Sequence, residues 1–577
     1  MTQAADAIVI GAGPNGLVAA NRLADAGWST LVLEQAEEPG GAVRTAEVTA
    51  PGFRNDLFSA FYPMAAASPV LRGLELERHG LRWKHAPAVL AHPRRDGPAA
   101  VLSRRLDETI ASVERCGPGD GVAYRTIIEQ WRRYGDSVVE ALLTPFPPLR
   151  AGAKLAWSAH LDGVRDLARV GLMPVQRFIE ERFQGDGAAL LFAGCALHAD
   201  LTPESANSAF IGWLLVCLGQ EMGFPVPEGG AGALTQALVA RLKAGGGTVC
   251  CASSVDRVII RNGRAVGVTT ADGSTYEARR AVLADCDAVR LYTSMISREH
   301  LPARLFNRLA RFQRGSGTFK VDWALSAPIP WADPSVAPAG TVHVADDLVE
   351  LSTMAHQLRI GVVPDRPFLL VGQMTTADAS RSPAGTESAW AYTHVPQEIR
   401  QDAGDDGITG RWNDRERQRF ARRMEQRLEA LAPGFSELIL ARHVMAPPDL
   451  ERRNPNLVGG DVGGGTSQLH QQLVFRPVAG WGRAETPIRR LYLASASAHP
   501  GGAVHGACGA NAARAALAHD WVQRWVRAGH RRIARVGPPA AEGVATGPAP
   551  PREAVAAAQS ALVRRVEERP AGGTVGV

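Results

Sequence analysis

The sequence predicts an α/β protein with a Rossmann-like, mostly parallel sheet that is discontinuous in sequence, together with an inserted α+β domain and a helical cap. Two observations predict this fold class. Near the start of the chain, an apolar run at residues 7–10 leads into a glycine-rich turn and a helix-like stretch at 17–26. Near the other end, the apolar residues 491–493 lead into a second glycine-rich turn and an alanine-rich helix. Strand, glycine turn and helix in this order form the unit from which doubly wound sheets are built.

The first glycine-rich turn has the pattern G-x-G-x-x-G, and its surroundings complete a dinucleotide-binding unit. A further apolar run at residues 30–33 ends in an acidic residue. In such a unit the glycines allow a tight turn and a close approach to a pyrophosphate. The helix N-terminus attracts the phosphates, and the acid accepts hydrogen bonds from a ribose. The predicted dinucleotide contacts are Gly11, Gly13, Pro14, Asn15, Gly16 and Glu34.

The residues after the second strand favour FAD over NAD. A carboxylate at Glu34 would repel the 2′-phosphate of NADP, which leaves FAD and NAD. Gly40 and Gly41 stand where NAD dehydrogenases ordinarily have a crossover helix, and they indicate backbone that runs close to a ligand. Arg44 could either bind a phosphate or hold this loop. We therefore expect an FAD site that includes these three residues.

The second glycine-rich turn, within residues 491–517, predicts another close approach of the backbone to the same ligand. Gly501, Gly502 and Val504 are its expected cofactor contacts. His505 follows directly, and a histidine beside a bound flavin can carry a proton near neutral pH. A structural hydrogen bond is the alternative role for this histidine.

These features together resemble one known family, the phytoene desaturase-like FAD-dependent oxidoreductases, which include carotenoid desaturases and isomerases. Within it the chain is most similar to the branch labelled pyridine nucleotide-disulfide oxidoreductase domain-containing protein 2. Five segments carry the resemblance: residues 11–34, 40–44, 227–234, 459–465 and 491–517. One departure is visible, because Ala503 stands where the family often has a third glycine.

The resemblance implies roles for two further residues. Val255 is expected to contact the adenine of FAD through its backbone. Lys320 is similar in position to a strand lysine that related amine oxidases place near the flavin and a bound water, although a surface position is equally open. No metal ligands are expected. A second G-x-G-x-x-G is absent from the sequence, so we expect no separate nicotinamide domain, and the electron acceptor stays unknown.

The pattern along the chain predicts two intertwined domains. We expect an FAD-binding domain at residues 1–75, 225–290 and 485–536, and a substrate and cap domain at 76–224 and 291–484. Helices are expected at 106–113, 123–143, 175–183 and 414–431. Strands are expected at 248–253, 254–261, 265–271, 274–279, 281–284 and 318–325, with Asn-Gly and Asp-Gly turns between some of them.

The end of the chain has a different composition. Residues 537–577 are rich in Ala, Pro and Gly and are predicted to be disordered, with one helix at 552–568. Before them, Trp521 and Trp525 stand among arginines. This segment could lie on an anionic membrane surface or pack on the sheet as a terminal helix, and we favour the second interpretation.

Composition excludes several classes of function. The net charge of +5 is small for 577 residues, and no basic segment is concentrated enough to predict a nucleic-acid partner. The seven cysteines include no C-x-x-C, which speaks against a dithiol relay. Their odd number and the lack of a recognisable export signal favour the cytoplasm. The longest apolar run, 209–218, is too short to span a bilayer, so membrane contact would be peripheral.

The leading functional hypothesis is an oxidoreductase that uses FAD to take a hydride from an apolar, polyene-like substrate, or that isomerises it without net oxidation. The candidate apolar walls are Phe210, Trp213, Leu214, Leu215 and Met222, although ordinary helix core is the favoured interpretation of these residues. The second hypothesis is an amine oxidase-type flavoenzyme, for which the sequence shows no aromatic cage. The third is a flavin-fold binding protein with little turnover.

Overall fold

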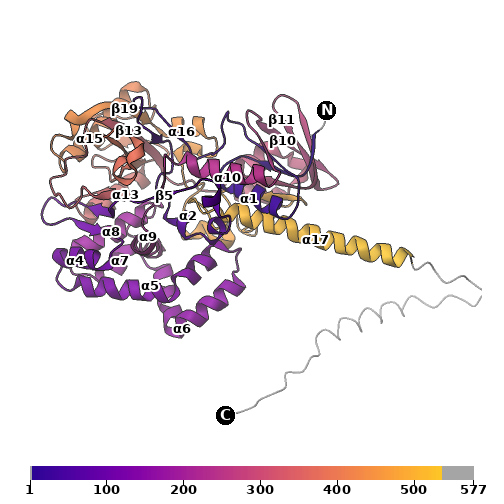
Figure 1. Ribbon diagram of the computed structural model, residues 1–577, viewed down its shortest axis with the longest axis horizontal. Helices are drawn as coiled ribbons and strands as arrows, with labels where there is room; N and C mark the ends of the chain where they lie inside the picture. The colour runs from indigo at the N-terminus through magenta and orange to yellow at the C-terminus, as the bar shows by residue number, and fades with distance from the viewer. Residues whose placement is uncertain (1–2, 536–577) are drawn as a thin grey trace, which may run out of the picture. The chain divides into compact units, whose positions relative to one another are not determined.

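The computed structural model describes residues 3–535, with side chains described as far as residue 526. Of the described residues, 3–520 pack as one compact unit, and 521–535 belong to a second unit. The first unit contains two seven-stranded sheets and a layer of helices (Figure 1). The predicted tail at 537–577, with its helix at 552–568, lies outside the described residues.

The first sheet has the strand order β10-β11-β12-β1-β2-β9, and β20 pairs with β12. Its strands are β1 (Gln3–Ile10), β2 (Thr30–Leu33), β9 (Thr248–Cys250), β10 (Val255–Arg261), β11 (Arg264–Thr270), β12 (Thr275–Ala284) and β20 (Leu491–Leu493). β1 runs parallel to β2 and β12, and only β10 and β11 are antiparallel additions. Helix α1 (Pro14–Asp25) follows β1 directly. The Rossmann-like α/β class is therefore confirmed.

One strand of this sheet corrects the sequence prediction. The strands expected at 274–279 and 281–284 are a single strand, β12. Its first half pairs antiparallel with β11, and its second half pairs parallel with β1 and β20. The burial pattern changes where the strand passes from the exposed hairpin into the centre of the sheet, where both faces are covered. In the sequence, this change from alternating to continuous apolar residues looks like a boundary between two strands.

The second sheet has the strand order β19-β13-β17-β16-β14-β6-β7. Its strands are β6 (Ala88–His92), β7 (Ala100–Leu102), β13 (Gly317–Leu325), β14 (Ala339–Val344), β16 (Leu369–Gln373), β17 (Glu387–Val395) and β19 (Ile439–Met445). All nine residues of β13 are buried, as expected for a strand with both faces covered. Associated helices are α13 (Leu348–Ile360), α15 (Asp414–Glu429) and α16 (Pro447–Arg453).

A group of helices lies below the second sheet in Figure 1. They are α4 (Leu106–Cys116), α5 (Asp120–Leu143), α6 (Leu149–Leu172), α7 (Val175–Glu180), α8 (Asp186–Leu197) and α9 (Ser208–Met222). The sequence did not predict α6, which begins directly after the proline-rich break at 145–148. Helix α8 is buried on all sides from Gly187 onward. No helix in residues 3–535 is both long and apolar enough to cross a bilayer.

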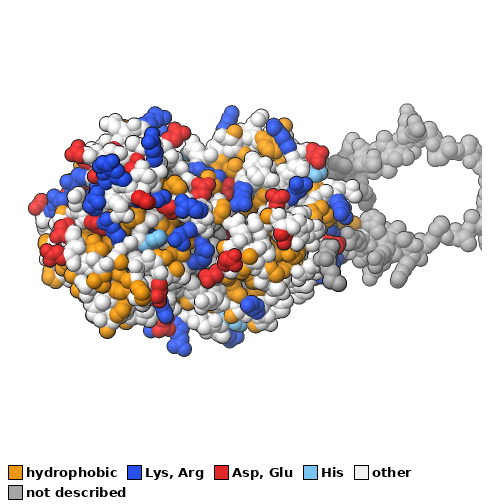
Figure 2. Space-filling model, turned by 90° about the horizontal axis from the view of Figure 1, so that it is seen from above, with side chains coloured by type: hydrophobic (Ala, Val, Ile, Leu, Met, Phe, Trp, Pro, Cys, Tyr) orange, Lys and Arg blue, Asp and Glu red, His pale blue; other side chains and the backbone are white. Residues whose placement is uncertain are grey.

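The remaining elements connect these layers. Helix α10 (Gly232–Ala244) packs on α1, and α17 (Ala507–Arg535) is the last helix described. Shorter elements are β3 (Thr45–Ala46), β4 (Asn55–Asp56), β5 (Trp83–Lys84), β8 (Val226–Pro227), β15 (Val362–Val363), β18 (Gln401–Asp402), α2 (Pro63–Ala67), α3 (Pro69–Arg72), α11 (Ala288–Arg290), α12 (Ala303–Leu309) and α14 (Met374–Ala377). On the face in Figure 2, basic and acidic side chains are interspersed.

Candidate active site

One large cavity, of about 910 Å³, takes its walls from both sheets and from the helical cap. The predicted site residues that line it are Gly11, Gly13, Pro14, Asn15, Glu34, Gly41, Val255, Lys320, Gly502, Val504 and His505. The predicted site residues that do not line it are Gly16, Gly40, Arg44 and Gly501. The opening turn and the closing turn, almost 500 residues apart in sequence, therefore share one cavity.

Asp285, directly after β12, packs against the opening turn and was missed by the sequence analysis. Its Oδ2 accepts a hydrogen bond from the Gly16 N–H at 2.7 Å. A Cβ atom at Gly13 would lie 2.7 Å from the same oxygen, and one at Gly16 would lie 2.2 Å from the Gly11 carbonyl oxygen. These glycines are thus required by contacts within the protein as well as by any ligand. Burial raises the pKa of Asp285 to about 7, with a further contribution from the negative charge of Glu34.

The opening turn also offers groups that fit a dinucleotide. Asn15 lines the cavity, and its Oδ1 is buried without a hydrogen-bond partner among the described residues. The N-cap of α1 is Gly13, which has no side chain, and no acidic residue lies in the first turn. Asp285 accepts only the Gly16 N–H of this turn, so the rest of the helix N-terminus is available to phosphate. Glu34 is fixed at the end of β2, because its two carboxylate oxygens accept the N–H groups of Ala12 and Ala36 at 2.7 and 2.9 Å.

Arg44 holds the loop after β2 and does not reach the cavity. Its guanidinium donates to the backbone carbonyls of Gly41 and Arg453, at 3.1 and 2.9 Å. Of the two roles expected for Arg44, the structure supports holding the loop. A Cβ atom at Gly40 would lie 2.6 Å from the Val43 carbonyl oxygen, so this glycine serves the same loop. Gly41 is the glycine of the pair that lines the cavity.

The glycine-rich loop at 463–466 is held from two sides. Arg476 is fully buried and donates to carbonyl oxygens of this loop, the shortest of these bonds being 2.8 Å, and to the Ala496 carbonyl oxygen at 2.9 Å. Asp461 accepts hydrogen bonds from two amides of the same loop, at 2.8 and 2.7 Å. The loop thereby packs against the closing turn, where a Cβ atom at Gly502 would lie 2.8 Å from the Gly463 carbonyl oxygen.

The departure at Ala503 leaves the backbone path unchanged. Ala503 has a φ of 80°, in the left-handed region that glycine occupies without cost. An alanine in this region is strained by roughly 1–2 kcal/mol. The closing turn therefore keeps the conformation expected of a glycine at this position, and Ala503 lines the cavity together with Gly502.

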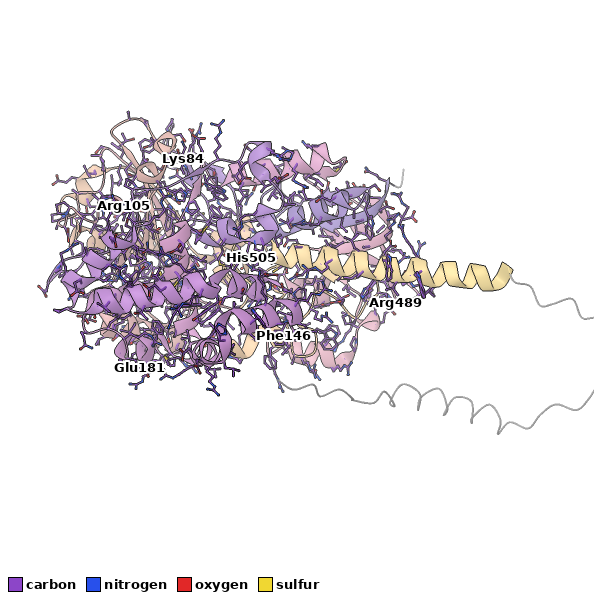
Figure 3. The ribbon with its side chains drawn as sticks, turned by 60° about the horizontal axis from the view of Figure 1, so that its bottom comes forward. Lys84, Arg105, Phe146, Glu181, Arg489 and His505 are labelled. Atoms are coloured by element: carbon purple, nitrogen blue, oxygen red, sulfur yellow. The ribbon has the colours of Figure 1, made fainter. Side chains whose placement is uncertain are left out.

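His505 lies at the start of α17 (Figure 3). There it forms a hydrogen bond within the protein. Its Nδ1 accepts the Ala507 N–H at 3.0 Å, and its carbonyl oxygen accepts the Ser68 hydroxyl at 2.7 Å. Burial lowers the pKa of His505 to about 4. The lowered pKa and the hydrogen bond to Ala507 favour the structural role, one of the two that the sequence left open for this histidine.

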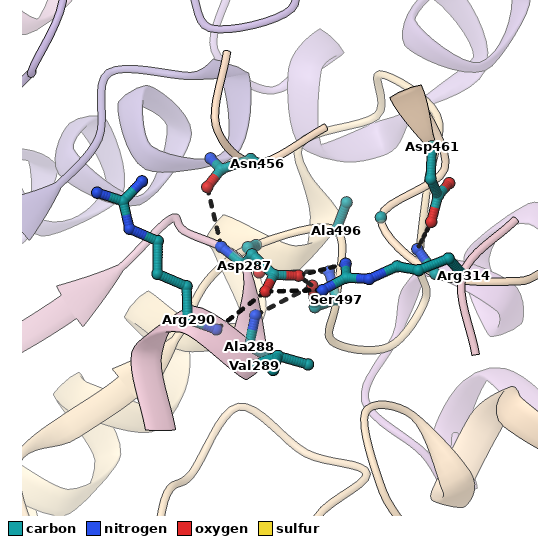
Figure 4. Close-up of polar contacts among 12 residues, drawn as sticks. Asp287, Ala288, Val289, Arg290, Arg314, Asn456, Asp461, Ala496 and Ser497 are labelled. Carbon is teal, nitrogen blue, oxygen red and sulfur yellow. Dashed lines mark hydrogen bonds and ion pairs between the residues drawn. The ribbon is translucent and has the colours of Figure 1, made fainter. Parts of the chain in front are cut away.

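Asp287 is the centre of a polar network that joins three distant segments (Figure 4). Its carboxylate accepts two hydrogen bonds from Arg314, at 2.6 and 3.0 Å, and its backbone N–H donates to Asn456 at 2.9 Å. Ser497, in the segment that leads to the closing turn, donates to the same carboxylate at 3.5 Å. The network fixes the end of the first sheet relative to the loops that line the cavity.

The second sheet contributes a charged and aromatic floor. Lys320 on β13 stands directly opposite Tyr392 on β17. Its ammonium group forms an ion pair with Asp322 and lies 5.8 Å from the centre of the Trp390 ring. Trp390 and Tyr392 are stacked, with ring centres 5.9 Å apart. Lys320 is only 3% exposed, which excludes the surface position that the sequence left open.

A buried histidine beside this floor was also missed. His394 stands opposite Thr318, and its Nδ1 lies 2.8 Å from a carboxylate oxygen of Asp200. Burial opposes the positive charge of His394, but the Asp200 carboxylate raises the pKa of the histidine above its usual value. Asp200 lies in the turn after α8, almost 200 residues before His394 on β17, so no local pattern could have paired them.

The cap supplies only some of the expected apolar walls. Phe210, Leu214 and Leu215 on α9 line the cavity, while Trp213 and Met222 do not. Trp213 instead packs edge-on against Trp131 of α5, with ring centres 5.0 Å apart. These residues therefore divide between cavity wall and helix core.

Comparison with known proteins agrees with this site. The family model of the flavin-containing amine oxidoreductases matches residues 15–309, and the chain belongs to this family. A mouse (Mus musculus) protein called pyridine nucleotide-disulfide oxidoreductase domain-containing protein 2 is 28% identical over 553 residues, covering 88% of this chain and 92% of its own. A limonene dehydrogenase polypeptide of Castellaniella defragrans is 25% identical over 537 residues, covering 88% and 94%.

A phytoene desaturase (neurosporene-forming) of Cereibacter sphaeroides is 23% identical over 544 residues, covering 89% of this chain and 94% of its own. The resemblance to phytoene desaturase-like flavoproteins is thereby confirmed, and FAD is the cofactor. Among solved structures, an oxidoreductase from Methanosarcina mazei has the same fold, with a TM-score of 0.58, 17% identity, and coverage of 89% of this chain and 99% of that one.

Proposed function

We propose that this FAD-dependent oxidoreductase acts on an apolar, polyene-like substrate, either by hydride transfer to the flavin or by redox-neutral isomerisation. The observation that carries the proposal is the contrast within one cavity. Glycine turns and Asn15 form one side, and the apolar side chains Phe210, Leu214 and Leu215 form another. Contact with such a wall favours an apolar substrate by roughly 25 cal/mol per Å² removed from water.

When bound, FAD supplies the acceptor for a hydride from carbon, and the protein supplies binding, orientation and exclusion of water. We assign the diphosphate to the N-terminus of α1 and Asn15, the ribose to Glu34, and the adenine to the backbone of Val255. The closing turn at 502–504 is assigned to the flavin ring. Lys320 is held by Asp322 on the floor and provides a fixed positive charge at the reacting end.

The names of two relatives support an apolar substrate. One is a limonene dehydrogenase and the other a phytoene desaturase, and both names denote hydrocarbons. A second candidate is oxidation of an amine, which the family name and one observation favour. The stacked rings of Trp390 and Tyr392 form the kind of aromatic surface that attracts a cation, and the sequence had not suggested it.

We propose further that the protein collects this substrate at a lipid surface and has no nucleic-acid partner. The support lies in the second unit, where the side chains of Trp521 and Trp525 are 66% and 70% exposed. Exposed tryptophans among arginines suit the interface of an anionic membrane. Binding to anionic vesicles by the full chain, lost in the double variant Trp521→Ala/Trp525→Ala, is the expected result. Unchanged binding of this variant would refute the assignment.

An anaerobic titration of the purified holoprotein tests the proposed function. Bleaching of the flavin absorbance by a lipid extract, and not by aliphatic amines, is the expected result for an oxidation. For an isomerisation, the extract changes composition while flavin that was reduced beforehand stays reduced. Bleaching by amines alone would establish the second candidate and refute the first. A colourless protein that takes up no added FAD would refute both.

A further inference from the structure

Three potential metal ligands lie together beside the cavity. Cys195 and His198 stand three residues apart at the end of α8, a spacing that places both on one face of the helix. His343 reaches them from β14. One ligand atom from each residue lies within 4.8 Å of the other two. Cys195 and His343 are fully buried, and His198 lines the cavity, so the cavity is the accessible side of this group.

His198 and His343 face each other, and one nitrogen of His343 has no partner among the described residues. The Nε2 atoms of the two rings are 2.7 Å apart. The Nδ1 of His343 is buried without a hydrogen-bond partner in the described part of the chain. An unprotonated imidazole nitrogen is the atom that binds a metal ion.

The helix backbone is adapted to the position of this ring. A Cβ atom at Gly194 would lie 2.1 Å from the Nδ1 of His343, so only glycine lets the ring approach α8 at this point. The rings of His92 and Phe368 stand edge-on to that of His343, at 6.1 and 5.4 Å between centres. The orientation of His343 toward Cys195 and His198 is thus fixed from several sides.

We propose that Cys195, His198 and His343 bind one divalent zinc-type cation, with a fourth coordination position open to the cavity. One thiolate and two imidazoles form a donor set typical of zinc, and three protein ligands with one open position are the usual arrangement where a site faces a cavity. Binding releases the thiol proton of Cys195 to solvent. Nearby, His394 is paired with Asp200. The ion joins the end of α8 to β14.

The sequence prediction of no metal ligands is revised by this proposal. The only local signal in the sequence is the Cys-x-x-His spacing at 195–198. The third ligand comes from a strand almost 150 residues later in the chain.

Metal content and cobalt substitution test the site in the full-length holoprotein. We expect about one equivalent of zinc per chain after purification without chelators. Exchange for Co²⁺ should give a thiolate-to-cobalt charge-transfer band, because a cysteine sulfur is a ligand. Saturating zinc should raise the Tm of the metal-stripped protein by at least about 2 °C, since a ligand that binds only the native state stabilises it.

Cys195→Ser and His343→Gln should each reduce bound metal at least about tenfold, and Cys195→Ser should remove the charge-transfer band. The matched control is Cys217→Ser, which changes another fully buried cysteine on the adjacent helix α9 and should leave metal content and band unchanged. FAD content reports that each variant is folded. Wild-type protein without metal and without a cobalt band would overturn the proposal. Equal metal content and equal cobalt bands in the Cys195 and Cys217 variants would also overturn it.

Discussion

The two ends of the cavity are built in different ways. The end formed by the opening and closing turns is mainly backbone, because Gly13 and Gly502 pack so closely against neighbouring atoms that a side chain has no room. The opposite end consists of side chains from strands of the second sheet, such as Lys320 and Tyr392, which meet only through strand pairing. The shape of the first end therefore depends on the path of the backbone. The second end depends on which side chains the strand register of the second sheet places opposite one another.

This difference suits a protein that holds one constant cofactor and a substrate that varies among relatives. Phosphates and a planar ring can be bound by backbone amides and helix ends, and these groups do not depend on particular side chains. Discrimination between substrates needs side chains of particular size and charge. The two ends should therefore respond differently to substitution, and the predictions below separate them.

Replacement of a glycine at the backbone end should have the largest effect of all these substitutions, and the quantity it reduces is bound FAD. Gly13→Val places a side chain against Asp285, where even a Cβ atom has only 2.7 Å. We expect bound FAD to fall below about one tenth of the wild-type amount, which corresponds to a loss of more than roughly 1.4 kcal/mol in binding. The measurement is flavin per chain after gel filtration, with circular dichroism to confirm folding.

The control for this variant is Gly152→Ala on α6, where an added Cβ atom meets no other atom within 4 Å. It should retain wild-type FAD. A folded Gly13→Val protein with stoichiometric FAD would show that the opening turn does not form the phosphate end.

At the side-chain end, Lys320→Met should leave Asp322 buried without its partner. Breaking a buried ion pair in this way costs roughly 3–5 kcal/mol in the free energy of unfolding. We also expect flavin reduction or reoxidation to slow about tenfold, equivalent to about 1.4 kcal/mol. The double variant Lys320→Met/Asp322→Asn should recover the stability without recovering the rate.

Stopped-flow absorbance of the flavin and thermal unfolding supply the two readouts. Lys154→Met, which changes an exposed lysine of α6, is the matched control and should alter neither. If the double variant reacts at the wild-type rate, the charge of Lys320 has no part in the chemistry.

Asp285, which packs against the backbone end, makes the stability of the protein depend on pH. The pKa of this carboxyl is about 7 in the folded protein against 3.8 as the ordinary value, so the folded state holds the proton more tightly. Its contribution to stability is complete below about pH 4 and is lost as the pH rises toward 7. Asp285→Asn cannot ionise and escapes this loss.

We therefore expect the Tm of FAD-free Asp285→Asn to exceed that of FAD-free wild type by a few degrees at about pH 8, with a smaller difference at about pH 5. Differential scanning fluorimetry across this range is sufficient. A difference that is independent of pH would show that Asp285 does not titrate as its burial requires.

The smallest effect should come from Ala503→Gly. Relief of left-handed strain and the greater freedom of glycine in the unfolded chain act in opposite directions, each by about 1 kcal/mol, so stability should change by less than about 1 kcal/mol. Gly502→Ala, one residue earlier, should instead weaken FAD retention. Equal effects of the two variants would contradict the close contact assigned to Gly502.

The sequence predicted the backbone end far better than the side-chain end. The turn between β1 and α1 and the turn before α17 are local patterns, and their glycines can be read directly. Asp285 could have been found, because it follows a predicted parallel strand, where ligands of such sheets bind. The pairing of His394 with Asp200, and of Cys195 with His343, depends on contacts between distant elements, so no local pattern predicts it.

At two positions the structure favours one of the two roles that the sequence left open. Arg44 could bind a phosphate or hold its loop, and its guanidinium donates to backbone carbonyls of that loop and of Arg453. His505 could carry a proton or form a structural hydrogen bond, and its burial and its bond to the Ala507 amide favour the structural role. The sequence shows that both residues are polar and stand next to predicted cofactor contacts. Their roles depend on their hydrogen-bond partners, which only the structure shows.

Hydrogen exchange of FAD-free protein before and after addition of FAD tests the central claim most directly, since that claim is that two turns at opposite ends of the chain hold one cofactor. We predict that FAD slows exchange in both peptides 11–17 and 501–508, while helix α15 at 414–429, which does not line the cavity, is unaffected. Protection confined to one of these turns, or found in neither, would contradict the shared site.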